Sequence, residues 1–486
     1  MKWSAGACLA TGAIAALLAA CATPARRVDV PLPAKFDWVA RDAIPSWPTK
    51  EWFKDFGSEE LASLMSEALQ QNLDLQASVE RVVQADARAR EAHATILPSV
   101  ELNPATDYLA GHSSSGSAHE LDYGVMLSAS YEVDFWGKNR AKADSAAYLS
   151  LAARADRDTV RLTTEAAVAN TYFEVISLRE RLATARANID SARQVLGIVQ
   201  SRFKAGYAAP VEVATQTAAV ASLEAAIPEL QQSQTRALSA LALLLGRAPE
   251  SFTIQAESLN QLHEPAVTPG LPAQLLRRRP DIALAEANLA SAHADLQAAR
   301  AALFPSLTLT AAGGVQNPAV NAAVNTLAGF GPSLNLSASL VQTIFDAGRL
   351  RAQRREAESH EQELLIGYRS SILSALVDVE NALSAMARLD EGRAAQAQFL
   401  AQSERALEGA RARYERGSGD LLGALQAQTA VFTARDQLNQ YRLARLQASV
   451  SLFKALGGGW QIDAIDAPAH LGNALAVHAA SAAEQP

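Results

Sequence analysis

Two windows without proline constrain the fold of this chain most. The 486-residue sequence has 19 prolines, yet none lies between Pro104 and Pro210, or between Pro332 and Pro468. The stretch from Lys138 to Leu196 also lacks glycine. Windows of this length far exceed an average globular helix. We therefore expect a first long helix over 138–204, about 67 residues and ~100 Å long.

A second long helix is expected in the later window, where only three single glycines interrupt the pattern. A short glycine-bearing turn follows each long helix, and another helical stretch follows each turn. Pro228 is expected to kink or break the shorter helix in which it lies. About a fifth of the residues are alanine, far above ordinary usage, so neighbouring helices are expected to pack closely. The expected helices span 138–204, 211–245, 349–416 and 421–456.

The chain reads as an internal duplication. Four anchors recur in the same order, each 211 residues further on or close to it. Repeats of this kind predict two equivalent helical hairpins. The matched pairs are Gly137-x-x-Arg140 with Gly348-x-x-Arg351, Leu127–Ser130 with Leu336–Ser339, Arg202-Phe203-x-x-Gly206 with Arg413-Tyr414-x-x-Gly417, and Leu245-Gly246 with Leu456-Gly457.

Each repeat also holds two short segments in which apolar and polar residues alternate, as in strands with one apolar face. Residues 99–103 are expected to pair with 122–133, and 306–312 with 333–340. Polar stretches such as 111–117 predict long loops in both hairpins. Four strands cannot close a membrane barrel, for which eight is the smallest number. Either they form small soluble sheets or several chains pool them, and three chains would supply twelve.

The first residues predict a secreted, lipid-anchored protein. An apolar segment follows Lys2 and ends in Leu18-Ala19-Ala20-Cys21, which is similar to a bacterial lipobox. Residues 1–20 are therefore expected to be a signal peptide and Cys21 the lipid attachment site, although an ordinary signal peptide remains an alternative. Ala22 after the cysteine favours the outer membrane. Residues 21–57, with five prolines between 24 and 48, are expected to be a linker.

Composition and motifs exclude several function classes. The net charge is −8, which argues against nucleic-acid binding. Two cysteines, Cys8 and Cys21, are too few for a disulfide scaffold or a cysteine zinc site. The eight histidines are scattered, so no metal site or other cofactor is expected. No nucleophile elbow or phosphate loop is present, and we expect no enzyme. The basic run 277–279 is read as the start of a helix that pairs with nearby acids.

Five motifs carry a resemblance to a known family. They are 52–57 (WFKDFG), 134–140 (DFWGKNR), 275–282 (LLRRRPDI), 301–306 (AALFPS) and 452–460 (LFKALGGGW). In this order they resemble the TolC and NodT outer-membrane efflux lipoproteins over nearly the whole mature chain. The resemblance implies an α+β membrane protein: a trimer with a twelve-stranded β-barrel in the outer membrane, continued by a twelve-helix periplasmic α-barrel with a mixed equatorial domain.

The resemblance also implies partners and a domain plan. Members are exit ducts of tripartite pumps of the resistance-nodulation-division type, working with a periplasmic adaptor and an inner-membrane pump. Type I protein secretion shares the fold and stays an alternative, as does a non-pore adaptor or coiled-coil scaffold. The expected segments are a first efflux repeat at 58–257, a linker at 258–272, a second repeat at 273–460 and a C-terminal segment at 461–486.

The two helix turns are expected to form a periplasmic tip that meets the adaptor and closes the duct at rest. Relatives often carry Leu-x-x-x-Asp-Ala-Gln-Arg after the second turn, whose charges contribute to an ionic latch. Here Gln426 and Thr429 replace both charges, while Leu422 keeps the apolar constriction. Glu212 and Asp420 could form rings of carboxylates, or could point outward to solvent or adaptor. The expected adaptor-contact residues are Gly206, Tyr207, Gly417, Ser418 and Gly419.

Overall fold

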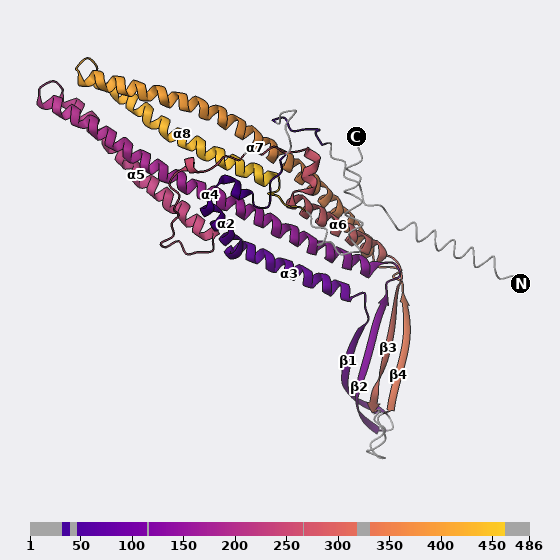
Figure 1. Cartoon of the computed structure of the whole chain (residues 1–486). Helices are drawn as coiled ribbons and strands as arrows, with labels where there is room; N and C mark the ends of the chain where they lie inside the picture. The colour runs from indigo at the N-terminus through magenta and orange to yellow at the C-terminus, as the bar shows by residue number, and fades with distance from the viewer. Residues whose placement is uncertain (1–31, 39–45, 114–115, 266, 318–330, 462–486) are drawn as a thin grey trace. The chain divides into compact units, whose positions relative to one another are not determined.

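The computed structural model describes residues 32–38, 46–113, 116–265, 267–317 and 331–461 (Figure 1). The chain divides into two compact units. A sheet unit takes residues 95–145 and 289–369, and a helical unit takes 32–94, 146–288 and 370–486. Each unit draws on both predicted repeats, so compactness does not follow the repeat boundaries. The signal peptide, Cys21 and most of the C-terminal segment lie outside the described residues.

Four helices dominate the chain and form two hairpins (Figure 1). Helix α4 spans Lys138–Lys204 and α7 spans Arg349–Glu415, with 67 residues each. Helix α5 spans Pro210–Leu244 and α8 spans Leu421–Ala455, with 35 residues each. All four agree with the predicted ranges to within one residue at each end. Pro228 lies inside α5 without ending it.

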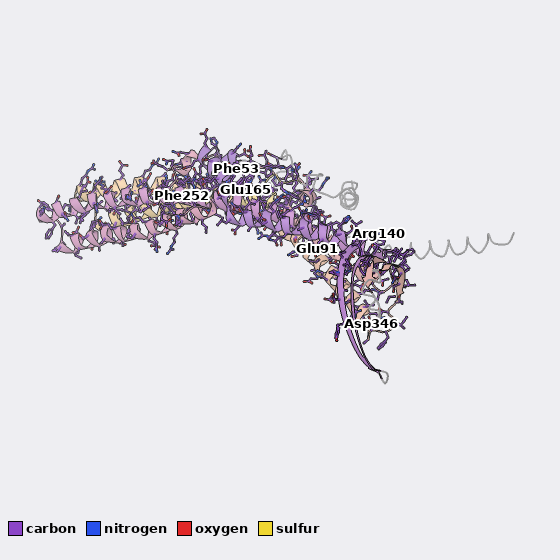
Figure 2. The ribbon with its side chains drawn as sticks, turned by 90° about the horizontal axis from the view of Figure 1, so that it is seen from below. Phe53, Glu91, Arg140, Glu165, Phe252 and Asp346 are labelled. Atoms are coloured by element: carbon purple, nitrogen blue, oxygen red, sulfur yellow. The ribbon has the colours of Figure 1, made fainter. Side chains whose placement is uncertain are left out.

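Helices α4 and α7 begin by the same means, within the sheet unit. Gly137 and Gly348 take positive φ angles of 76° and 86° just before the helices start. Asp134 then accepts hydrogen bonds from two backbone amides of α4, at 2.8 and 3.0 Å. Asp346 accepts from the amides of Gly348 and Leu350 at 3.0 Å each (Figure 2). A carboxylate at a helix start satisfies free amides and favours the dipole.

The core of the helical unit is built on a short N-terminal segment. Here η1 (Trp52–Phe56) precedes α2 (Glu59–Gln71) and α3 (Leu73–Ala94). The Trp52 indole stacks on Phe453 of α8 with ring centroids 5.1 Å apart, and Phe56 packs on Phe173 of α4 at 5.0 Å. The last residues of the predicted linker are thus buried, and they anchor the N-terminal segment against both hairpins.

The segment between the hairpins contains η2 (Leu259–Gln261), η3 (Pro272–Arg277) and α6 (Pro280–Ala301). The predicted pairing of the basic run with acids is confirmed at Arg279, whose guanidinium is buried. It contacts Asp281 at 2.7 Å and Asp378 at 3.0 Å, and donates to the Ala455 carbonyl. Arg278 instead lies over the Trp47 ring, 4.4 Å from its centroid.

The sheet unit contains one antiparallel sheet with strand order β1-β2-β3-β4 (Figure 1). The strands are β1 (Ser99–Ser113), β2 (Gly116–Val133), β3 (Ser306–Asn317) and β4 (Gly331–Val341). The long loop predicted at 111–117 is wrong, because β1 continues to Ser113, which pairs with Gly116 at the start of β2. Backbone pairing that starts at the apolar residues continues through these small polar ones, whose side chains do not enter the ladder. The second predicted loop lies outside the described residues.

The sheet has one apolar face and one polar face, as the alternation predicts. Val100 and Leu102 of β1 share a face with Val125 and Leu127 of β2, because Leu102 pairs with Leu127. The polar face carries Glu101, Asn103, Ser128, Ser130, Thr308, Thr310, Ser337 and Ser339. The exposed apolar side chains of the other face are those of Val100, Leu102, Val125, Leu127, Leu309, Leu334, Leu336 and Leu340.

Candidate functional site: the hairpin tips and the apolar sheet face

The turns at the ends of the two hairpins have the same backbone geometry. Gly206 and Gly417 both take the left-handed conformation, with φ angles of 80° and 74°. After α4, the amide of Gly206 donates to the Phe203 carbonyl and that of Tyr207 to the Arg202 carbonyl, at 3.0 and 2.8 Å. After α7, the amides of residues 417 and 418 repeat this pattern. This is the Schellman ending, which favours glycine because a Cβ strains the left-handed residue.

The two acids predicted at the tip begin the helices that follow the turns. Asp420 is the N-cap of α8 and accepts from the Gly423 amide at 3.0 Å. Glu212 is the third residue of α5, and its Oε1 accepts from the Ala209 amide at 3.1 Å. The two helices thus use opposite halves of a capping box. Both carboxylates therefore have local partners within one chain, a role that the sequence analysis did not assign.

Glu212 also links the two hairpins. The hydroxyl of Tyr414, near the end of α7, donates to Glu212 Oε2 at 2.8 Å. The Arg202 guanidinium of α4 lies over the Tyr414 ring at 4.7 Å from its centroid, and donates to the Tyr414 carbonyl. Tyr414 is only 3 % exposed and packs with Val199 and Leu421. Burial, then the hydrogen bond and charge of Glu212, raise the pKa of Tyr414 to about 12, so its hydroxyl stays a donor at neutral pH.

The predicted gate residues share one exposed face of α8. Leu422 is 62 % exposed, and Gln426 and Thr429 are exposed beside it at helical spacing. Among the predicted adaptor-contact residues, Tyr207 is 76 % exposed, and the Ser418 hydroxyl donates to the Arg413 carbonyl at 3.2 Å. The structure therefore brings the predicted tip residues to two similar turns. The face of α8 that carries Leu422 and Gln426 is exposed to solvent.

The sequence analysis missed the roles of Arg202 and Tyr414. Both residues belong to the repeated Arg-Phe/Tyr-x-x-Gly motif, which was used only to align the repeats. Their contact joins residues 212 positions apart, and no local pattern reports such a contact. Conservation of chemistry between the two turns is the one signal in the sequence that marks them.

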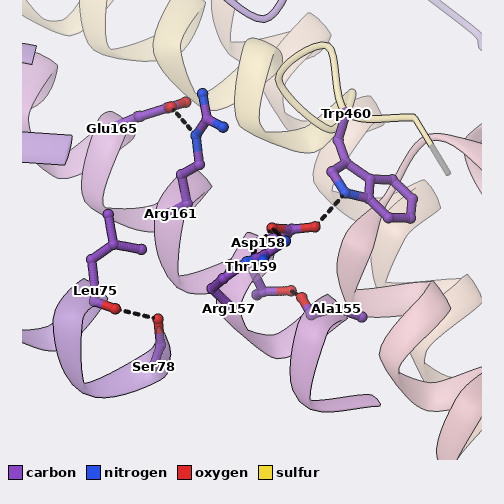
Figure 3. A network of polar contacts seen from close by, with 9 residues as sticks. All are labelled: Leu75, Ser78, Ala155, Arg157, Asp158, Thr159, Arg161, Glu165 and Trp460. Carbon is purple, nitrogen blue, oxygen red and sulfur yellow. Dashed lines mark hydrogen bonds and ion pairs between the residues drawn. The ribbon is translucent and has the colours of Figure 1, made fainter. Parts of the chain in front are cut away.

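A second polar cluster lines a cavity of about 210 Å³ in the helical unit (Figure 3). Asp158 pairs with Arg157 at 2.7 Å and accepts from the Trp460 indole at 2.9 Å. Glu165 accepts from Arg161 at 2.9 Å, and burial raises the pKa of its carboxyl, an effect that Arg161 opposes. The hydrogen bond from Trp460 holds the residues just past α8 against α4, and the two ion pairs lie within α4. We assign the cluster a structural role.

The apolar face of the sheet is the other candidate site. Monomeric soluble proteins seldom leave so large a contiguous apolar patch uncovered, and such patches mark membrane or protein contacts. Both outer strands, β1 and β4, also present one backbone edge without a strand partner in the described sheet. No helix in the described part of the chain combines the length and apolar character needed to cross a membrane.

Comparison with known proteins identifies the family. The model of the outer membrane efflux protein family matches residues 64–247 and again 271–458. The pyoverdine export outer membrane protein OpmQ of Pseudomonas aeruginosa is 42 % identical over 458 residues, covering 92 % of this chain and 96 % of the relative. The cation efflux system protein CusC of Escherichia coli O6:H1 is 30 % identical, covering 90 % and 95 %. The nodulation protein T of Rhizobium leguminosarum is also 30 % identical, covering 89 % and 92 %.

Solved structures agree with this assignment. The outer-membrane channel OprN matches with a TM-score of 0.84 at 27 % identity, covering 91 % of this chain and all of the other. The open-state MtrE channel of Neisseria gonorrhoeae matches at 0.78, also with 27 % identity, over 91 % and 98 %. The predicted resemblance and the absence of an enzymatic role are confirmed. The chain belongs to the outer membrane efflux protein family and is an outer-membrane exit duct of an efflux system.

Proposed function

We propose that three copies of this chain form one continuous duct. In the duct, the sheets pool into a twelve-stranded barrel and the helices into a twelve-helix periplasmic tunnel. One observation carries the proposal: a four-stranded sheet with an exposed apolar face and two open edges. An open edge cannot face lipid, and closure with copies of itself removes it. The polar face then lines a wet interior.

The internal duplication belongs to this proposal. Helices α4 and α7 have equal length, as do α5 and α8, and the backbone hydrogen bonds of the two hairpin turns correspond at an offset of 211. Two matches to one family model support the same view. Three chains with two repeats each would give pseudo-sixfold packing, in which the small side chains allow close approach of helices.

Native mass spectrometry in detergent tests the assembly. We expect a trimer that retains its strands by circular dichroism and gives single-channel conductance in planar bilayers. A stable monomer with intact strands would refute the trimeric duct.

Lipidation at Cys21 is a separate part of the proposal. It is supported by the lipobox and the proline-rich tether, together with the relative SilC, named a probable outer membrane lipoprotein. Mass spectrometry of the mature protein is expected to show an N-terminus at Cys21 carrying acyl mass. Cys21→Ala should weaken localisation without unfolding the barrel. An unmodified N-terminus beyond residue 21 would contradict lipidation while leaving the duct in place.

We also infer that the hairpin tips meet a periplasmic adaptor served by an inner-membrane pump, and that they close the mouth at rest. The exposed Leu422 would form an apolar ring, with Gln426 amides bridging neighbours and the acids giving a preference for cations. Leu422→Ser should raise resting conductance. The double variant Glu212→Gln/Asp420→Asn should reduce cation preference in reversal-potential measurements. An unchanged resting conductance in Leu422→Ser would refute the apolar gate. An unchanged cation preference in the double variant would refute the acidic ring.

For cargo, we propose a pyoverdine-type siderophore in preference to a metal cation. The support is the 42 % identity to the pyoverdine exporter against 30 % to a cation-efflux relative. Expression in a Pseudomonas aeruginosa strain that lacks OpmQ tests this assignment. Recovery of pyoverdine in the medium, measured by mass spectrometry, would support it, with the same strain carrying an empty vector as the control. Outer-membrane protein that forms channels but restores no export would contradict this cargo.

A further inference from the structure

The junction between the two hairpins within one chain supplies a template for the junction between chains. Strands β2 and β3 belong to different repeats and pair antiparallel, with Val133 opposite Leu307 and Tyr131 opposite Leu309. If the duct closes as proposed, β4 of one chain pairs with β1 of the next chain. In this junction β4 takes the place of β2, and the partner's β1 takes the place of β3. The inference below rests on that trimeric duct and fixes its register.

The two hairpins have to be aligned before the template can be used. Ser99 pairs with Ser130 in the first hairpin, and Ser306 pairs with Val341 in the second. Since Ser99 and Ser306 both follow a proline and begin their strands, Val341 is the equivalent of Ser130. That offset of 211 is the one that also relates Gly137 to Gly348 at the helix starts. The four-letter repeat Leu-Ser-Ala-Ser would align Ser130 with Ser339 instead. Ser339 pairs with Thr308, which neither follows a proline nor begins its strand, so this alignment does not match the strand starts.

The ends of the strands support the same alignment. Strand β2 runs three residues past Ser130, and these residues pair with β3 alone. The equivalent three residues past Val341 are 342–344, which have no strand partner in the described sheet. Ile344 at their end is 90 % exposed. It is the counterpart of Val133, and its exposure indicates a strand segment that awaits its neighbour.

We propose that β4 of one subunit extends to residue 344 and pairs antiparallel with β1 of the next. In this register Ile344 lies opposite the partner's Val100. Gln342 lies opposite the partner's Leu102, and Leu340 opposite the partner's Pro104. Val100 is 63 % exposed and lies on the apolar face that Leu340 shares, so the apolar band continues across the junction. A slip of one residue would place Ile344 against the partner's Glu101 and turn the faces over.

Disulfide crosslinking between subunits tests the register. The mature chain is expected to lack a free thiol, so introduced cysteines report alone. Val100→Cys would be combined in turn with Ile344→Cys, Gln342→Cys or Leu340→Cys, then oxidised with copper phenanthroline and run on non-reducing gels. Directly opposed residues meet the geometry of a disulfide, whereas those two positions away do so poorly. We expect roughly tenfold more covalent trimer from the Ile344→Cys combination.

Each outcome separates the register from the trimer itself. Strongest crosslinking with Leu340→Cys would overturn the proposed register in favour of the one that the four-letter repeat suggests, in which Val100 is equivalent to Leu309 and Leu340 to Tyr131. Strongest crosslinking with Gln342→Cys would overturn it in favour of a register shifted by two residues. Single variants that crosslink would indicate twofold pairing of like edges and overturn it as well. A trimer in native mass spectrometry with no crosslinks in any combination overturns the register alone, whereas a monomer overturns the proposed duct. Leu102→Cys with Gln342→Cys tests the same register if the first pair fails to fold.

Discussion

The hydrogen bond between Tyr414 and Glu212 should stabilise the association of the two hairpin tips. Tyr414→Phe removes only the hydroxyl that donates to Glu212 at 2.8 Å and keeps the ring under Arg202. A hydrogen bond to a charged group contributes about 1.5 to 3 kcal/mol, and the half-buried Glu212 places this one at the lower end. About 1.4 kcal/mol corresponds to a tenfold change in an equilibrium constant. We therefore expect the opening equilibrium at the tip to rise about tenfold.

Hydrogen–deuterium exchange of the tip peptides measures this equilibrium directly. Amides around residues 199–213 and 414–425 should exchange about tenfold faster in Tyr414→Phe, whereas those of 440–455 should not change. Tyr207→Phe is the matched control, because this tyrosine lies in the same turn but is 76 % exposed. Unchanged tip exchange in Tyr414→Phe, or an equal change in the control, would refute the link.

The same contact has a defined pH dependence. The pKa of Tyr414 is raised from 10.0 to about 12 in the folded chain. A raised pKa means that the folded state holds the proton more tightly. The stabilisation is therefore complete below pH 10 and is lost as the pH rises through about 12. Tip exchange in the wild type should thus be insensitive to this group near neutrality, and should approach that of Tyr414→Phe only in strong alkali.

Other substitutions test the interior. Glu165→Gln should raise the thermal midpoint at pH 7, because burial raises the pKa of this carboxyl and so penalises its charged form. The difference in midpoint between variant and wild type should shrink as the pH falls and Glu165 takes up its proton. A difference that grows at lower pH would contradict this prediction. Gly206→Ala should cost about 1 to 2 kcal/mol from its positive φ alone. Gly457→Ala should cost well above that, because its Cβ would meet the Arg278 carbonyl at 1.7 Å, so equal melting of the two variants would refute the steric argument. Arg279→Met should lower stability by about 1 to 3 kcal/mol, read from thermal melts, since it leaves the buried Ala455 carbonyl without its donor.

Much of the candidate site could be predicted from local signals. The turn glycines fixed where α4 and α7 end, and the alternation of apolar residues identified the strands. The predicted tip residues Leu422, Gln426 and Thr429 do share one exposed face, because helical spacing alone requires it. The capping role of Glu212 and its link to Tyr414 were not predicted, because the second partner lies on another hairpin.

The sequence alone determined the elements, since backbone conformation depends on neighbours within a few residues. Windows without proline permit long helices, left-handed turns require glycine, and period-two patterns require strands with two unlike faces. Tertiary structure decided what these elements meet. It carried β1 to Ser113 and began β2 at Gly116, inside the expected loop, and it placed β2 beside β3. Register depends on the whole ladder of pairs, and no short stretch of sequence contains that sum.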